Sequence, residues 1–183
     1  MAKIILEGCD RLGKSTLING ILNSLGYHQV MHFEKPRLLA IYQDEVLGRD
    51  PLRSYQEASF KNMFKLLSAY DANIICDRSH IGEAVYSDLY RNYDGNYVFD
   101  LEDAFIGSGS SFHLQTTLIL LTTDNFGFIT DDGMSFDFSK KEEEQNRFIK
   151  AVNRSKIKNK RIINVHNGQG GFKTPKQILD EIL

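Results

Sequence analysis

A glycine-rich segment near the start of the chain lies between an apolar run and an amphipathic run. Gly8-x-x-x-x-Gly13-Lys14-Ser15 follows the apolar residues 4–6 and precedes 14–25, where leucine and isoleucine recur at helical spacing. In this context the glycines let backbone N–H groups surround phosphate oxygens, and the helix adds the positive end of its dipole. The pattern predicts a phosphate-binding loop. Lys14 is expected to reach the β- and γ-phosphates, the Ser15 hydroxyl to bind Mg²⁺ and Thr16 to touch the α-phosphate.

Strand and helix patterns alternate along the rest of the chain. Short apolar runs predict five strands, at 4–6, 29–33, 73–76, 117–121 and 161–165. Helical spacing predicts helices between them, at 14–25, 37–47, 54–70 and about 80–90. Such alternation is typical of parallel strands that helices cover on both faces. We therefore expect an α/β fold, a P-loop NTPase three-layer sandwich with a five-stranded parallel sheet, in one domain over 1–183 with a lid at about 125–139.

Single residues predict several helix boundaries. Gly48 and Pro51 predict a break between the second and third helices. Residues 92–113 are ambiguous, and we expect a loop with a short helix there. Ser139, with glutamate three positions later, forms a capping-box pattern that predicts a helix start. Pro175 is predicted to occupy the favoured first position of a last helix.

Composition and charge narrow the functional classes. The 183 residues carry a formal net charge of -2, which gives no general attraction to nucleic acids. Cys9 and Cys76 lie far apart without metal-site spacing, so a reducing compartment is expected. The N-terminus shows no leader pattern, and no apolar run is long enough to span a bilayer. We expect no membrane partner and a cytoplasmic location, which would be the host cytoplasm if the chain is phage-encoded.

A second polar element follows the third predicted strand. Asp77 ends the run Asn-Ile-Ile-Cys, which is how a sheet fixes a carboxylate that organises a metal beside phosphates. ATPases that activate water often place glutamate directly after such an aspartate, whereas here Arg78 follows and offers a fork for a phosphate. The chain also lacks the Asn-Lys-x-Asp pattern of guanine-reading switches. Both features favour transfer to an acceptor over hydrolysis, although a strand-end salt bridge is the simpler alternative for the two residues.

These motifs resemble those of thymidylate kinases. The segment EGCDRLGKST, residues 7–16, is similar to the loop of the eukaryotic and viral members, which carry Asp-Arg inside it. The segment CDRS, residues 76–79, is similar to their Asp-Arg-Tyr/Ser element after the third strand, and FEKP, residues 33–36, lies where they carry an Arg/Phe-x-Pro element after the second strand. DRSHIGEAVY, residues 77–86, also resembles phage-encoded deoxynucleotide kinases. The resemblance covers most of the chain in element order and is specific in the loop and in Asp77-Arg78.

The resemblance implies roles for the charged residues. Asp10 matches the aspartate that contacts the sugar hydroxyl of the acceptor nucleotide, and Arg11 matches an arginine finger on the transferring phosphoryl group. Bacterial relatives often carry this arginine in the lid, but 125–138 holds no Arg or Lys. The implied catalytic residues are Asp10, Arg11, Lys14 and Arg78, with Mg²⁺ on Ser15 and Asp77. The implied ATP-binding residues are Gly8, Cys9, Arg11, Leu12, Gly13, Lys14, Ser15 and Thr16.

The acceptor pocket departs from the family pattern. The third helix carries lysines where the family has an arginine that helps bind the acceptor. A phenylalanine on this helix stacks on thymine in relatives, and Phe60 and Phe64 are the candidates, with Phe64 preferred. Aromatic residues at helical spacing are also typical of a core. Asp10, Glu34, Arg37 and Arg78 complete the expected acceptor-binding set, and for Glu34 and Arg37 a solvated loop is the alternative.

The expected function is Mg²⁺- and ATP-dependent phosphoryl transfer to a deoxynucleoside monophosphate. One alternative is a deoxynucleoside kinase, with Glu34 or Asp77 as the base. Another is a kinase of a hydroxymethylated pyrimidine in DNA, for which the five basic residues of 154–161 are the only support. A nucleotide-binding protein without transfer activity is a third alternative. Members of the family often form dimers, so a homodimer remains open.

Overall fold

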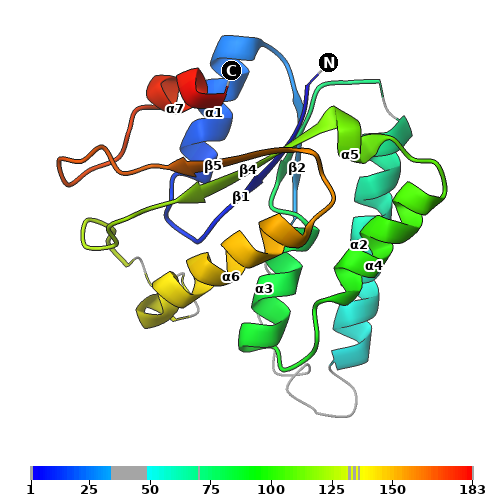
Figure 1. The fold of residues 1–183 in the computed structure, drawn as a ribbon. Helices are drawn as coiled ribbons and strands as arrows, with labels where there is room; N and C mark the ends of the chain where they lie inside the picture. Colours follow the sequence, from blue (N-terminus) through cyan, green and yellow to red (C-terminus); the bar gives the residue numbers. More distant parts are fainter. Residues whose placement is uncertain are drawn as a thin grey trace.

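A computed structural model shows a single parallel sheet at the centre of the chain (Figure 1). It describes residues 2–33, 49–69, 71–131, 133, 135 and 137–182. The strands are β1 (Lys3–Glu7), β2 (Gln29–His32), β3 (Ile74–Asp77), β4 (Thr116–Thr122) and β5 (Asn159–Asn164). Their order is β2-β3-β1-β4-β5, and every neighbouring pair is parallel. This arrangement confirms the α/β fold class with a five-stranded parallel sheet.

Helices cover both faces of the sheet. They are α1 (Lys14–Leu25), α2 (Arg49–Ala69), α3 (His80–Tyr90), α4 (Tyr97–Gly107), α5 (Phe112–Gln115), α6 (Lys141–Arg154) and α7 (Pro175–Ile182). Figure 1 shows α1 and α7 together on one face and α3 and α6 on the other, where α2 and α4 also pack. In the described part of the chain, no helix combines the length and the apolar character that crossing a membrane requires.

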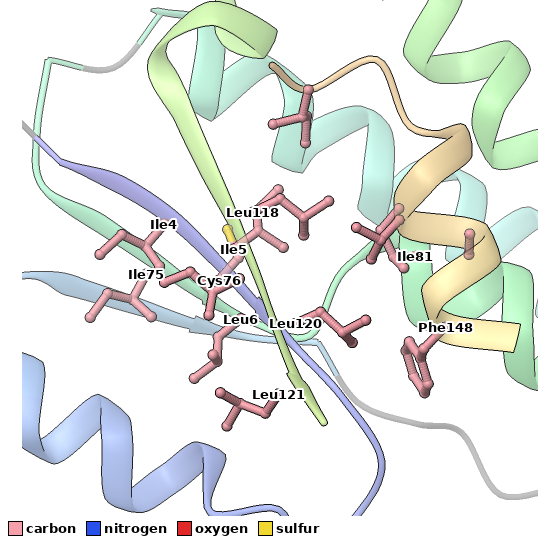
Figure 2. Packing of buried hydrophobic residues seen from close by; sticks show 14 of the residues in the cluster. Ile4, Ile5, Leu6, Ile75, Cys76, Ile81, Leu118, Leu120, Leu121 and Phe148 are labelled. Carbon is pink, nitrogen blue, oxygen red and sulfur yellow. The ribbon is translucent and has the colours of Figure 1, made fainter. Parts of the chain in front are cut away.

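The core lies between the sheet and both helix layers. All five residues of β1 are buried, because this strand has a neighbour on each side and helices on each face. Successive strand residues point to opposite faces. In Figure 2, Leu120 accordingly extends toward Ile81 of α3 and Phe148 of α6, whereas Leu6 and Leu121 lie on the side of α1. The near-continuous apolar strands of the sequence follow from this burial on both faces.

The parallel register brings the loops after β1, β3 and β4 to one end of the sheet. Leu6 of β1 pairs with Asp77 of β3 on one side and with Ile119 of β4 on the other. Arg78 continues this pairing, since its N–H donates to the carbonyl of Leu6 at 3.0 Å. Ligands of open α/β sheets bind beyond the carboxyl ends of the strands. The two polar elements found in the sequence are therefore neighbours in space.

Several predicted boundaries differ from the structure. β3 includes Asp77, and α2 begins at Arg49 rather than at 54. Pro51 does not belong to the predicted break, because it lies in the first turn of α2, where a missing N–H removes no helical hydrogen bond, and Gly48 lies outside the described residues. The ambiguous segment 92–113 holds all of α4, which is longer than the short helix we expected, and the start of α5. The predicted helix 37–47 lies outside the described residues.

The two predicted helix starts had different outcomes. Ser139 does not cap α6: a short 3₁₀ turn, Phe138–Lys140, precedes the helix, and the carboxylate of Asp137 accepts from the N–H of Ser139 at 3.0 Å. Aspartate competes effectively for this capping position, and the sequence pattern did not separate the two residues. α7 begins at Pro175 as predicted. Thr174 caps it by exchanging hydrogen bonds with Gln177, at 2.8 Å and 3.3 Å.

Gly20 of α1 provides a test of the contact between α1 and α7. A β-carbon at Gly20 would lie 2.7 Å from Cβ of Pro175, which is part of a rigid ring. Replacing glycine by alanine inside a helix ordinarily stabilises it by about 1 kcal/mol, but overpacking costs about 1–3 kcal/mol. We expect Gly20→Ala to lower the free energy of unfolding by about 1 kcal/mol in urea titrations. The neighbouring exposed Asn19→Ala is the control and should change it by less than about 0.5 kcal/mol; a stabilised Gly20→Ala would contradict the close packing.

Candidate functional site

The predicted phosphate loop joins β1 to α1, and the structure explains why glycine occupies both positions 8 and 13. Gly13 has a φ of 82° directly before α1, a conformation that residues with a side chain seldom adopt. Gly8 has a φ of 140°, and a β-carbon there would lie 2.6 Å from the carbonyl oxygen of Leu121 in β4. The loop can therefore pass close to the sheet only with glycine at this position.

Lys14 is buried inside the loop. Its Nζ donates to the carbonyl oxygens of Gly8 and Cys9, both at 2.8 Å. Burial and, after it, the nearby positive charge of Arg78 lower the pKa of Lys14 to about 8, against the opposing charges of Asp10 and Glu7. The lysine thus holds the loop around itself and places a titratable cation beneath the curled backbone.

A cavity of about 570 Å³ opens beside the loop. It contains most of the residues that the sequence assigned to phosphate and metal binding, and those that line it are Asp10, Arg11, Leu12, Gly13, Lys14, Ser15, Thr16, Asp77 and Arg78. The carboxyl ends of β1 and β3 thus contribute to one site, as the topology predicted. The far end is lined by residues that follow β4 and β5, among them Phe128 and Phe172.

Gly8 and Cys9, two of the expected ATP-binding residues, do not line the cavity. Their side of the loop contributes the carbonyl oxygens that hold Lys14. Cys9 is 1% exposed, and its Sγ donates to the carbonyl of Lys141 at 3.7 Å, so that it connects the loop to the start of α6.

An ion pair joins the phosphate loop to the element after β3. Nη2 of Arg78 donates to Oδ1 of Asp10 at 2.8 Å, and both side chains are largely buried. Arg78 has a φ of 71° and Arg11 a φ of 73°, left-handed conformations that are uncommon for arginine and cluster at functional sites. Arg78 also lines a second cavity, whose volume of about 10 Å³ has room for about one water molecule. Of this pair, Arg78 belongs to the walls of both cavities, whereas Asp10 lines the larger one.

Asp77 meets the requirements of a magnesium-organising carboxylate. Oδ2 lies 3.0 Å from Nδ1 of His32, whereas Oδ1 is buried and has no hydrogen-bond partner among the described residues. Ser15 and Asp77 line the same cavity. Across the described residues, no group of three or more His, Cys, Asp or Glu side chains gathers as a metal cage. Mg²⁺ bound together with phosphates needs only one or two carboxylates, so these residues fit such an ion.

Glu7 is a buried carboxylate that the sequence reasoning missed. It is 1% exposed, and its Oε1 accepts from Oγ of Ser79 at 2.6 Å and from N–H of Gly82 at 3.0 Å. Oε2 is buried without a hydrogen-bond partner among the described residues, and burial raises the pKa of Glu7. It joins the end of β1 to the start of α3, where Ser79 is the N-cap. A glutamate that ends an apolar strand directly before the loop glycine was the available signal.

The second cavity holds the candidates for acceptor binding. It is lined by Phe33, Gln56, Phe60, Arg78, Ser79, Gly82, Glu83, Tyr86 and Arg91. Glu83 is buried and forms an ion pair with Arg91, and its other oxygen accepts from the hydroxyls of Tyr93 and Tyr97. Phe33 and Phe60 pack with ring centroids 6.0 Å apart. The cavity therefore combines aromatic surface with a fixed carboxylate, an amide and Arg78.

Phe64, the preferred stacking residue, lies in the core instead. It is fully buried and packs against His80, Phe105 and Phe112, with centroids 4.9, 5.4 and 4.8 Å away. Phe60, one helical turn earlier, is the one that reaches the cavity. Residues four apart share a helix face, so sequence spacing could not separate the one near the site from the one in the core. Glu34 and Arg37 lie outside the described residues.

The basic segment 154–161 lies at the opposite end of the sheet, because β5 starts at Asn159 and the cavity lies beyond the strand carboxyl ends. Three of its cations are engaged within the chain. Arg154 lies over the ring of Phe99 at 4.4 Å, Lys156 pairs with Asp103 at 2.6 Å, and Lys160 donates to the carbonyl of Ser155 at 2.5 Å.

Known proteins share this fold at low sequence identity. No protein-family model and no curated protein matches the sequence. The YorR protein of Bacillus subtilis, solved with phosphorylated GDP, is 16% identical, with a TM-score of 0.62 over 99% of this chain and 93% of its own. Deoxyadenosine kinase of M. mycoides with bound dATP is 18% identical over 97% of each chain, with a TM-score of 0.54. Shikimate kinase of Aquifex aeolicus is 15% identical over 98% and 93%, with a TM-score of 0.53. The chain has the fold of the P-loop kinases.

The lowered pKa of Lys14 predicts a pH dependence for anion binding. A lysine is charged below its pKa, so the charge of Lys14 is lost as the pH rises through about 8. We expect the affinity for inorganic tripolyphosphate, measured by calorimetry without metal, to fall by up to about tenfold per pH unit above that point. Lys14→Met is the control, and the advantage of the unmodified protein over it should shrink over the same range. An advantage that persists to pH 10 would show that burial does not shift this lysine.

Proposed function

We propose that this chain catalyses phosphoryl transfer from ATP to a deoxynucleoside monophosphate. The ion pair between Asp10 and Arg78 carries the proposal, because it lies between a phosphate-loop cavity and a second cavity with aromatic and polar walls. A loop that only binds an anion gains nothing from Asp10, which repels phosphate. A loop that must also position a second substrate gains a carboxylate that can contact this substrate.

The donor phosphates would bind at the loop. Backbone N–H groups of 13–16 and the start of α1 supply positive partial charge, and Lys14 would exchange its carbonyl partners for phosphate oxygens. Ser15 and Asp77 would hold Mg²⁺, which neutralises developing charge on the transferring group. Phosphoryl transfer depends on positioning and electrostatic stabilisation more than on covalent chemistry, and the buried charges around the loop are suited to both.

The acceptor would bind at the second cavity, whose walls would have to move apart to admit a nucleotide because its volume is about 10 Å³. Arg78 would bind its phosphate and Asp10 its sugar hydroxyl, as the thymidylate kinase resemblance implies. Phe60 and Phe33 would face the base, and the amide of Gln56, buried in the same wall, can donate and accept hydrogen bonds at a base edge. These placements replace Phe64 by Phe60 in the acceptor pocket. Glu34 and Arg37 remain proposed acceptor residues.

Arg11 is the proposed arginine finger. It lines the phosphate cavity from within the loop, in a left-handed conformation that the loop imposes. Such an arginine, placed on the transferring phosphoryl group, stabilises charge that spreads over its oxygens in the transition state.

A deoxynucleoside kinase is the second candidate. Both arginines that line the inner cavity are paired with carboxylates, Arg91 with Glu83 and Arg78 with Asp10, and an acceptor without a phosphate would need neither of them to be released. Solved deoxyadenosine kinases share the fold. In this reading Glu34 or Asp77 would act as the base on a 5′-hydroxyl. The DNA-directed alternative has less support, because 154–161 lies away from the cavity.

An acceptor panel tests the proposed function. ADP release from MgATP should require a deoxynucleoside monophosphate and should be slow with free deoxynucleosides or with DNA containing hydroxymethylated pyrimidines. Turnover with deoxynucleosides alone would select the second candidate. Binding of ATP without ADP release for any acceptor would support a non-catalytic nucleotide-binding protein.

Substitutions in the loop test the division of roles. Arg11→Ala should lower kcat by about 10³-fold or more while the KM for ATP changes only a few-fold, because the finger acts mainly in the transition state. Lys14→Ala should abolish nearly all transfer. Arg161→Ala, which removes an exposed arginine on β5, is the matched control and should retain full activity. Full activity in Arg11→Ala would remove Arg11 from the mechanism.

A further inference from the structure

The end of the large cavity away from the phosphate loop has an aromatic and apolar wall. Phe128, Ile129 and Thr130 reach it from the segment after β4, and four residues from the segment after β5 and from α7 complete it: Phe172, Lys173, Pro175 and Ile178. Phe128, Ile129 and Thr130 belong to the predicted lid, 125–139.

The wall is built on an aromatic cluster of Phe128, His166 and Phe172. Phe128 stacks on His166 with centroids 5.0 Å apart and an angle of 18°, and it meets Phe172 edge-on at 4.8 Å and 83°. Nδ1 of His166 lies 2.7 Å from the carboxylate of Asp124, and Nε2 accepts from the N–H of Gly170 at 3.2 Å. Both nitrogens of the imidazole are thus engaged, and the ring that supports Phe128 is fixed in orientation.

Phe172 keeps 42% of its surface exposed although it lines a cavity. Its backbone is held by an antiparallel bridge to His166, and the next residue, Lys173, donates its N–H to the carbonyl of Val165 at 2.7 Å. Apolar ring surface that is fixed in place and faces a cavity is available to a flat ligand group.

Side chains that could read the edge of such a ligand are few at this end. Among the described lining residues away from the loop, the polar ones are Thr130 and Lys173, and Nζ of Lys173 is paired with Glu181 at 2.7 Å. No carboxylate or amide side chain of the described lining residues lies there. Strong discrimination between ligands of similar shape requires buried polar groups that match one and are left unpaired by the other.

We infer that the base of the donor nucleotide stacks on the aromatic cluster and is held by its flat face, so that the protein accepts several nucleoside triphosphates as donors. This inference rests on the proposed function, which it deepens by assigning the donor specificity. ATP and GTP should bind and support transfer within about tenfold of each other, since a π-face is common to every base.

Phe172→Ala tests the stacking contact. Its side chain is exposed, so the variant should fold normally. It should weaken the binding of ATP and of GTP in parallel, by about tenfold or more, while kcat changes less than about twofold. Phe172→Tyr keeps the ring and should bind both as the unmodified protein does. Tyr27→Ala removes an aromatic ring that is 85% exposed elsewhere, at the end of α1, and serves as the matched control.

Calorimetry with ATP, GTP and inorganic tripolyphosphate separates this inference from the proposed function, because it needs no acceptor. We expect both nucleotides to bind more tightly than tripolyphosphate, and Phe172→Ala to remove that advantage without changing tripolyphosphate binding. Such binding with no transfer to any acceptor would support the inference and refute the proposed function. Transfer from ATP with GTP more than about 100-fold weaker, or unchanged ATP binding in Phe172→Ala, would overturn the inference and leave the function standing.

Discussion

The parallel pairing of β1 with β3 on one side and with β4 on the other is the constraint on which the site depends. It aligns Leu6 with Asp77 and with Ile119, so the chain leaves three strands at nearly the same level of the sheet. The phosphate loop, Arg78 and the segment after β4 therefore surround one cavity although they are separated by up to about a hundred residues along the chain. A shift of β3 by one residue would turn Asp77 to the other face of the sheet.

Several buried charges lie around this end of the sheet, and three of them have partners within the chain. Lys14 is satisfied by loop carbonyls, Arg78 by Asp10, and Glu7 by Ser79 and the backbone of Gly82. Burying ions costs free energy that hydrophobic residues of similar volume would not cost. The burial does fix the orientation of these groups, and groups that are fixed before the reaction need no rearrangement when charge develops. The proposed phosphoryl transfer therefore explains the charged cluster better than a contribution to the stability of the fold does.

The sequence predicted the parts of the structure that local patterns control. α1 and α3 have the predicted bounds, and the loop glycines, Lys14 and Asp77 lie where their motifs placed them. The sequence could not predict which side chains of a helix face lie in the core and which reach the site. Phe60 and Phe64 share a helix face, and only packing against α4 and α5 shows that Phe64 belongs to the core. The capping of the turn before α6 by Asp137 depends on a competition between neighbouring polar residues. Glu7 was missed because its partners come from α3, far along the sequence.

The aromatic cluster has a mechanical consequence. Phe128 belongs to the segment after β4, whereas His166 and Phe172 belong to the segment after β5, and the pair of Asp124 with His166 adds a second connection. Neither segment can move outward alone without separating stacked rings. We therefore expect backbone opening in 124–130 and in 166–172 to be linked, so that the amide hydrogens of the two segments exchange with solvent together.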